Sequence, residues 1–473
     1  MERANVLLLM SDQHRADCLG MRGHPTLETP TLDSLAKSGA DFTSAYSATA
    51  LCAPARRTLL TGQSASRHGV LDENAQKPLT GATLAGLLGQ QGYQTHLVGK
   101  LHLWPPRNFH GFQSADWADW IDPRNDNDYT AFMRAQSRGR PWIVGQHAFD
   151  QNSRRACPWA LEEHLHFSNW CSDSAVSFLR ARDKRRPFFL MASFIPPHPP
   201  LFPLRELLEK YLARETPAPA IGRWSAFLAE PAADAVPLAW HGRLNPEAMH
   251  AFRAAYYASI EHIDTLIAPI LDRVPANTLI LYLSDHGDML GDHYLFRKRA
   301  PYEGATRIPL IIKLPESARA ARVSIDTAVE LMDIVPTVLD YLGLPLPETV
   351  DGVSLLPLVL RSGSIERQFI HGENSRLPPL GSGMQFVTDG KWKFVWYPSL
   401  GREQLFHLEK DPEELTDLAE DARHVGRLGE LRAQLVRALN GRAEGFTDGV
   451  QLLKQRVAES PRQSARKPAV RWE

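Results

Sequence analysis

Two short stretches of the sequence place acidic and imidazole side chains directly after apolar runs. Asp12 and Gln13 follow NVLLLMS, and Asp285 and His286 follow TLILYLS. Two carboxylates, an imidazole and an amide oxygen form a donor set that suits a divalent cation such as calcium, manganese or magnesium. A single aspartate in such a place is ordinarily a helix cap or a turn residue. The repeated arrangement therefore favours a metal site.

Cys52 stands in the stretch ATALCAPARRTLLTG and is one of four cysteines in the chain. Pro54 suits the first turn of a helix and Gly62 suits its end, so the stretch predicts a helix that begins near the cysteine. The start of a helix carries partial positive charge and favours anions. These residues alone leave two interpretations open: a buried small apolar side chain, or a thiolate of lowered pKa.

The elements that must position these residues are apolar runs rich in strand-forming residues. They cover residues 5–10, 93–99, 187–194 and 278–283. Continuous apolar strands of this kind are typical of a parallel sheet covered on both faces, and helical patterns lie between them, the clearest at 246–271. In such α/β folds the residues just beyond the carboxyl ends of the strands converge. Lys100 and His198 also follow predicted strands, so we expect them at the same site.

The pattern changes after residue 360 to short strands punctuated by turns. Asp389 and Gly390 predict a hairpin, and a helical segment follows at 428–439. We expect a catalytic domain over residues 1–365, a small α+β subdomain over 366–455 and a tail over 456–473.

The composition is that of an ordinary globular protein of 473 residues, with 43% hydrophobic residues and a formal net charge of -1. The charge gives no overall attraction to nucleic acid or to a membrane surface, so neither is an expected partner. The apolar run at 6–10 is too short for a membrane span or a signal peptide core. Few cysteines fit a reducing compartment, which predicts a cytoplasmic protein.

Cysteine, proline and arginine in LCAPARRTLLTG resemble the signature of the type I, formylglycine-dependent sulfatases of the alkaline phosphatase superfamily. Further segments resemble that family in family order: NVLLLMSDQHRAD, GKLHL, PPHPPLFP, SDHGDMLGDH, KRAPYEGATRIPLII and QLFHLEKDPEELTDLA. The resemblance spans most of the chain. It implies an alkaline phosphatase-like α/β/α sandwich with a mostly parallel central sheet and a smaller C-terminal antiparallel subdomain.

The resemblance implies that a formylglycine-generating enzyme converts Cys52 to Cα-formylglycine, which acts as its hydrate. The implied ligands of one divalent cation, calcium before manganese or magnesium, are Asp12, Gln13, Cys52, Asp285 and His286. The implied catalytic residues are Cys52, Arg56, Lys100, His102, His198, Asp285 and Lys298. The implied substrate contacts are Asn74, Lys100, His198 and Lys298.

The activity implied is hydrolysis of an alkyl, aryl or sugar sulfate monoester, a small molecule, to an alcohol and inorganic sulfate. Asp285 would take a proton as one hydroxyl of the hydrate attacks sulfur, and His198 with Lys298 would assist the departing alcohol. His102 would take the proton of the second hydroxyl, so that sulfate leaves and the aldehyde returns. A homo-oligomer is also expected.

Two features keep other interpretations open. Gln13 and His286 resemble the choline sulfatase and phosphonate monoester hydrolase branch, so hydrolysis of phosphonate monoesters or phosphodiesters is the second hypothesis. Lys100 and His102 favour the sulfate ester. A third hypothesis is an inactive metal-binding scaffold in which Cys52 stays unmodified. The tryptophans between residues 104 and 170 either form an aromatic cage for a quaternary ammonium group or pack a lid or a subunit interface.

Overall fold

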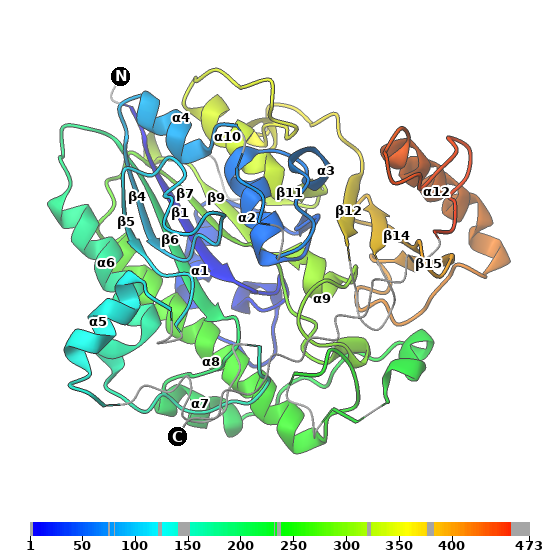
Figure 1. The fold of residues 1–473 in the computed structure, drawn as a ribbon, viewed down its shortest axis with the longest axis horizontal. Helices are drawn as coiled ribbons and strands as arrows, with labels where there is room; N and C mark the ends of the chain where they lie inside the picture. The colour runs from blue at the N-terminus through cyan, green and yellow to red at the C-terminus, as the bar shows by residue number, and fades with distance from the viewer. Residues whose placement is uncertain are drawn as a thin grey trace.

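The computed structural model describes residues 3–73, 76–79, 81–121, 125–140, 152–230, 232–233, 238–318, 323–375 and 383–455. Within these ranges an eight-stranded sheet forms the centre of the molecule (Figure 1). Its order is β10 (Val323–Ile325), β2 (Ala40–Phe42), β9 (Leu310–Lys313), β7 (Thr278–Ser284), β1 (Asn5–Asp12), β6 (Phe188–Pro197), β4 (Gln94–Gly99) and β5 (Ser114–Trp117).

The strands from β7 to β5 run parallel, which confirms the mostly parallel sheet expected from the sequence. Every residue of β1 is buried, and its side chains alternate between the two faces: Val6 and Leu8 pack into one apolar cluster, Leu7 and Leu9 into the other. β9 is antiparallel to both neighbours. Its four residues, LIIK, are too few for the sequence to predict whether the strand runs parallel or antiparallel to its neighbours.

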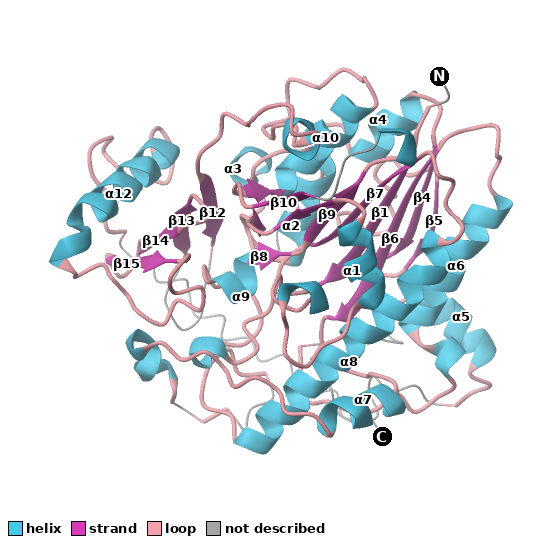
Figure 2. Cartoon of the chain, turned by 180° about the vertical axis from the view of Figure 1, so that it is seen from behind, coloured by secondary structure: helices cyan, strands magenta, loops and turns pink. Residues whose placement is uncertain are grey.

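Helices cover both faces of this sheet (Figures 1 and 2). One face carries α2 (Cys52–Thr61), α4 (Leu84–Gln90) and α10 (Ile334–Tyr341); the other carries α1 (Pro30–Lys37), α5 (Asp128–Gln136), α6 (Phe167–Ala181) and α8 (Pro246–Leu271). α8 spans the whole predicted segment. Asn245 caps it by accepting a hydrogen bond from the backbone N–H of Ala248, and proline occupies its first position.

The remaining strands outside the C-terminal part form a small sheet, β11 (Val329–Glu330), β3 (Ala45–Tyr46) and β8 (Arg307–Ile308). Short helices are α3 (Ala65–His68), α7 (Arg205–Leu212), α9 (Glu303–Thr306) and α11 (Leu356–Val359). None of the helices in the described part of the chain combines the length and apolar composition that crossing a bilayer requires.

A four-stranded antiparallel sheet follows, formed by β12 (Ile370–Asn374), β13 (Met384–Thr388), β14 (Trp392–Tyr397) and β15 (Arg402–His407). The hairpin between β13 and β14 is as predicted: Gly390 has φ 87°, and Asp389 accepts from two backbone N–H groups beyond it. α12 (Val425–Leu439) packs on one face of this sheet, and the other face packs on the catalytic part through Tyr302. The predicted tail, 456–473, lies outside the described residues.

Candidate active site

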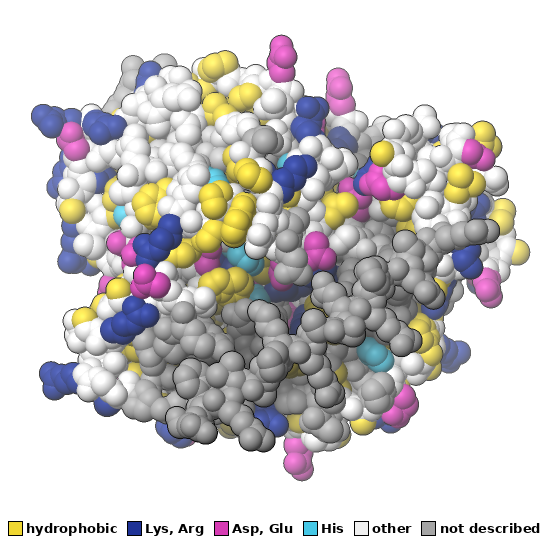
Figure 3. All heavy atoms as spheres, viewed as in Figure 1, with side chains coloured by type: hydrophobic (Ala, Val, Ile, Leu, Met, Phe, Trp, Pro, Cys, Tyr) yellow, Lys and Arg dark blue, Asp and Glu magenta, His cyan; other side chains and the backbone are white. Residues whose placement is uncertain are grey.

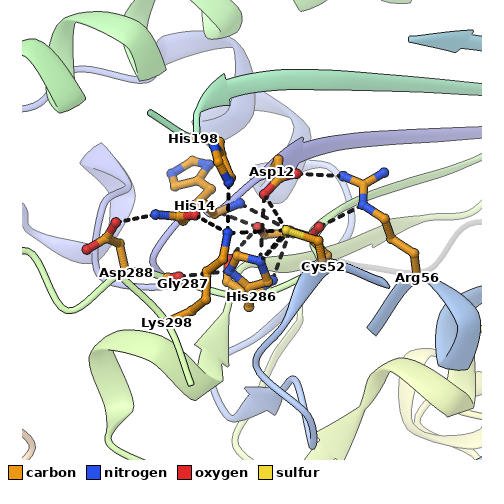
Figure 4. A network of polar contacts seen from close by, with 12 residues as sticks. Asp12, His14, Cys52, Arg56, His198, His286, Gly287, Asp288 and Lys298 are labelled. Carbon is orange, nitrogen blue, oxygen red and sulfur yellow. Dashed lines mark hydrogen bonds and ion pairs between the residues drawn. The ribbon is translucent and has the colours of Figure 1, made fainter. Parts of the chain in front are cut away.

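The carboxyl ends of the central strands meet the start of α2. Asp12 ends β1, and Asp285 follows β7 directly. His198 follows β6, and Cys52 is the first residue of α2. The expected convergence is therefore present in the structure (Figure 4). On the face shown in Figure 3, hydrophobic side chains border one side of a hollow near the centre, in which histidine and basic side chains are visible.

Arg56 links the two aspartates. It lies one helical turn beyond Cys52, is fully buried, and donates from Nε to Asp285 at 2.8 Å and from one terminal nitrogen to Asp12 at 3.2 Å. The other terminal nitrogen donates to the backbone oxygen of Lys100 at 2.7 Å and to Ser193 Oγ at 3.0 Å. Ser193 was not predicted; its signal was a hydroxyl inside an otherwise apolar strand.

Four ligand atoms gather beside this arginine. One atom each of Asp12, Cys52, Asp285 and His286 lies within 4.8 Å of the other three, and all four residues are buried. The Nδ1 of His286 lies 2.9 Å from the backbone oxygen of Gly287, which fixes the ring and turns Nε2 toward the cluster. Two carboxylate oxygens, a sulfur and an imidazole nitrogen thus form a group of donors of the kind that can hold a divalent cation.

Gln13 is held beside the cluster in a left-handed backbone conformation, φ 69°. Its side-chain N–H donates to Asp288, and its amide oxygen accepts from Lys298 Nζ at 2.8 Å. Asp288 also accepts from the backbone N–H groups of Leu290 and Arg297. Asp288 thus orients the glutamine, whose role as a cation ligand stays a prediction.

Positive side chains surround the sulfur of Cys52. Lys298 Nζ lies 3.3 Å and His286 Nε2 lies 3.1 Å from Sγ, and Lys100 Nζ lies 2.5 Å from Asp12 Oδ2. Burial alone would raise the pKa of the Cys52 thiol, but Lys100, Lys298 and His286 outweigh it and hold that pKa well below its ordinary value. Position 52 is thus electrostatically suited to a negative group.

The two imidazoles at the edges of the site differ in their environments. Burial, followed by the charge of Lys298, lowers the pKa of His198, whose Nε2 lies 2.8 Å from Lys298 Nζ. Burial would also lower the pKa of His286, but the negative charges of Asp285 and Cys52 raise it to about 9. The first ring is therefore biased toward its neutral form. The acidic groups around the second ring favour positive charge there, which either a proton on His286 or a cation bound in its place supplies.

His102 stands at the mouth of the site, half-buried, with φ 55°. Asp119 Oδ1 accepts from the backbone N–H groups of Leu101 and His102 at 2.7 and 2.8 Å, which sets this conformation. Asp119 was not predicted as a positioning residue, because the partners are backbone groups. The predicted substrate contact Asn74 lies outside the described residues.

A buried group of potential metal ligands, a cysteine at a helix start and two lysines lie at the carboxyl ends of a sheet covered on both faces. This is the arrangement expected of an ester hydrolase with an alkaline phosphatase-like fold. The sequence model of the Sulfatase family matches residues 4–344, and that of the N-sulphoglucosamine sulphohydrolase C-terminal region matches residues 291–441. The chain belongs to the sulfatase family of the alkaline phosphatase superfamily, a family of sulfuric ester hydrolases.

Individual relatives agree with this assignment. The chain is 37% identical to an arylsulfatase of Clostridium perfringens, over 96% of this chain and 98% of that one. It is 31% identical to a choline-sulfatase of Rhizobium meliloti, over 89% and 83% of the two chains. The crystal structure of a phosphonate monoester hydrolase of Agrobacterium radiobacter matches with a TM-score of 0.76 and 27% identity, covering 96% of this chain and 100% of that one.

Proposed function

We propose that this sulfatase hydrolyses small-molecule sulfate monoesters at Cys52 after a formylglycine-generating enzyme has converted that cysteine to Cα-formylglycine. The observation that carries the proposal is the surroundings of Sγ: Asp12 at 3.6 Å, His286 at 3.1 Å and Lys298 at 3.3 Å. Two hydroxyls of an aldehyde hydrate would find polar partners among these groups, whereas a buried thiol serving only for packing needs none.

Asp12, Asp285, His286 and the modified residue 52, with Gln13, would hold one divalent cation, for which calcium is the first candidate. When bound, the cation supplies charge neutralisation for the sulfate oxygens and for the nucleophile. Arg56 keeps the two carboxylates apart and oriented in this arrangement, since it donates to both.

The protein's own cations bind the sulfate group. A sulfate monoester is a poor electrophile until the charge on its oxygens is balanced. Lys100, Lys298 and the N-terminus of α2 surround position 52 and supply fixed positive charge in a buried environment. The lysines thus orient the sulfur atom toward the nucleophile.

Four side chains move protons. Asp285 accepts the proton of the attacking hydroxyl. His198 and Lys298, whose nitrogens are 2.8 Å apart, act as one unit that delivers a proton to the departing alcohol oxygen. His102, on the open side of the site, takes the proton of the second hydroxyl as sulfate leaves, so water need not attack sulfur.

Phosphonate monoester hydrolysis is the competing activity. The structural likeness to the Agrobacterium enzyme supports this activity as the second candidate, and so do Gln13 and His286. Lys100 and His102 favour the sulfate ester, because they belong to the GKLHL segment, which resembles the sulfatases at this lysine–histidine pair. The four cysteines are free, which supports a reducing, cytoplasmic location.

The test compares initial rates on 4-nitrophenyl sulfate and on an aryl phosphonate monoester, using protein produced with a formylglycine-generating enzyme. We expect higher kcat/KM on the sulfate and none of this activity in Cys52→Ala. A much higher kcat/KM on the phosphonate would overturn the substrate assignment. Unmodified Cys52 after production with that enzyme, together with absence of turnover on both esters, would support an inactive scaffold.

A further inference from the structure

We propose that a cavity beside the reactive centre, which we call the tryptophan pocket, holds the alcohol part of the substrate and selects an uncharged planar ring. The inference rests on the proposed function and names its substrate class. The cavity measures about 310 Å³ and is lined by Ala53, Arg57, His102, Trp104, Asp119 and Trp120, among others. Its volume is at the lower end for small-molecule pockets, which fits one ring and its substituents.

The pocket opens next to the group that would react. Ala53 follows Cys52 in the first turn of α2, and His102 belongs to both the site and the pocket wall. Trp120 joins the two spaces: its ring lies edge to face with His102 at 4.7 Å between centroids, and Lys100 Nζ lies 5.1 Å from its centroid. A sulfate held by Lys100 would therefore lie beside Trp120, which is part of the pocket wall.

The walls of the pocket are positioned before any ligand binds. Asp119, the residue before Trp120, fixes the backbone at residues 101 and 102, which lie just before Trp104 in the sequence. Arg57 donates to the backbone oxygens of Lys77 and Pro78 and so holds the opposite wall. Trp104 stands at the open side and is 39% exposed, a large apolar surface left to water. Rigid aromatic walls give a bound ring large contact area at little entropic cost.

The charged side chains of the pocket disfavour a substrate whose alcohol part is cationic. Asp119 and Glu73 in the lining are balanced by Arg57 and Lys77, so these charges sum to zero. Lys100 already occupies a cation–π contact with Trp120. A quaternary ammonium group would bind best between free aromatic faces beside a net negative charge. An uncharged ring gains the contact area of both tryptophans without displacing a lysine or facing its charge.

The substrate test uses Trp104→Ala, because this side chain makes no described contact with the catalytic residues. We expect kcat/KM for phenyl sulfate to fall about tenfold, mainly through KM, and to stay unchanged for methyl sulfate. Trp104→Phe should restore most of the phenyl sulfate value. The matched control is Trp392→Ala. Trp392 lies on β14 in the C-terminal sheet and not in the pocket, so this variant should leave kcat/KM for both esters unchanged.

Choline sulfate is the charged arm of the same experiment. If Trp104→Ala changed kcat/KM equally for phenyl and methyl sulfate, or left the value for phenyl sulfate unchanged, the pocket would not be the binding site of the alcohol part. A Trp104-dependent preference of the wild type for choline sulfate over phenyl sulfate would overturn the choice of an uncharged ring.

A binding measurement separates this proposal from the proposed function. Titration of the non-catalytic Cys52→Ala protein with phenol, followed by calorimetry, should show binding that Trp104→Ala weakens about tenfold. If wild-type protein hydrolyses no ester while phenol still binds in this way, the proposed function fails and the ring site stands. If esters are hydrolysed while phenol shows no binding that depends on Trp104, the pocket fails and the function stands.

Discussion

Arg56 donates a hydrogen bond from Nε to Oδ2 of Asp285 over 2.8 Å, and both side chains are fully buried. The arginine thereby connects the cysteine-bearing helix to the carboxylate that follows β7. The same guanidinium donates to Asp12, so the arginine of the LCAPARR segment orients both carboxylates of the candidate metal site.

Replacing Arg56 by alanine leaves two buried carboxylates without their shared partner. We expect the free energy of unfolding to fall by about 3 to 5 kcal/mol, as when one member of a buried ion pair is removed. Chemical denaturation measures it. Arg57→Ala is the control: among the described residues its guanidinium donates to two backbone oxygens and to no carboxylate, so its loss should cost less. An equal loss in the two variants would contradict the bridging role.

Cation binding should depend on Asp285. A chelator should abolish sulfate ester hydrolysis and lower the melting temperature, and added calcium should restore both. Asp285→Asn removes a negative ligand, so its calcium affinity by calorimetry should fall at least about tenfold. Asp292→Asn is the matched control, because that carboxylate pairs with Arg15 and Arg253 outside the cluster. Unchanged calcium binding in Asp285→Asn would rule out the assigned ligand set.

Lys298 should act on the transition state. It contacts Cys52, His198 and Gln13, so Lys298→Ala removes positive charge where sulfate oxygens and the leaving oxygen gather. We expect kcat/KM for 4-nitrophenyl sulfate to fall roughly 10²- to 10³-fold, with a folded protein by circular dichroism. Lys313→Ala, on β9, serves as the control lysine. A decrease of kcat/KM by less than threefold would show that Lys298 does not stabilise the transition state.

Glu414 should make stability depend on pH. Burial, and then repulsion from Glu303, raise the pKa of Glu414 to about 7 despite the opposing charge of Lys393. The native state therefore keeps this proton to higher pH than the unfolded chain does. The stabilisation that this bound proton contributes is fully present below the ordinary pKa of glutamate and is lost as the pH rises through about 7.

Glu414→Gln, which stays neutral, should flatten that decline by up to about 1.4 kcal/mol per pH unit between pH 5 and 7. Lys393 keeps its ion pair with Glu303 at 2.7 Å in this variant. Melting temperatures across the pH series measure the slope, with Glu409→Gln, at a half-exposed ion pair, as the control. Parallel curves for the wild type and Glu414→Gln would contradict the assigned shift.

Much of the scaffold could be predicted because its signals are local. The apolar strands, the helix over residues 246–271 and the hairpin at Gly390 each follow from periodicity or turn chemistry within a short window. The meeting of Asp12 with Asp285 followed from the rule that strand ends converge. Family resemblance then added the roles of residues that no local pattern distinguishes.

The remaining features depend on contacts that are distant in the sequence. Ser193 reaches Arg56 only because β6 lies beside β1, and the orientation of Gln13 depends on Asp288 from another strand end. Asp119 acts on backbone N–H groups, which leave no trace in residue types. The tryptophan pocket combines side chains from α2 and from the segment after β4, so the sequence alone left the tryptophans with two interpretations.

The most direct test of the central claim relates the chemical state of residue 52 to activity. Protein prepared with graded amounts of the maturing enzyme is analysed by peptide mass spectrometry, and sulfate release is measured on the same samples. Specific activity should rise from a zero intercept in proportion to the fraction of residue 52 that is formylglycine, in which one sulfur and two hydrogens of cysteine are replaced by one oxygen. Full sulfate release by protein that carries only unmodified Cys52 would contradict it.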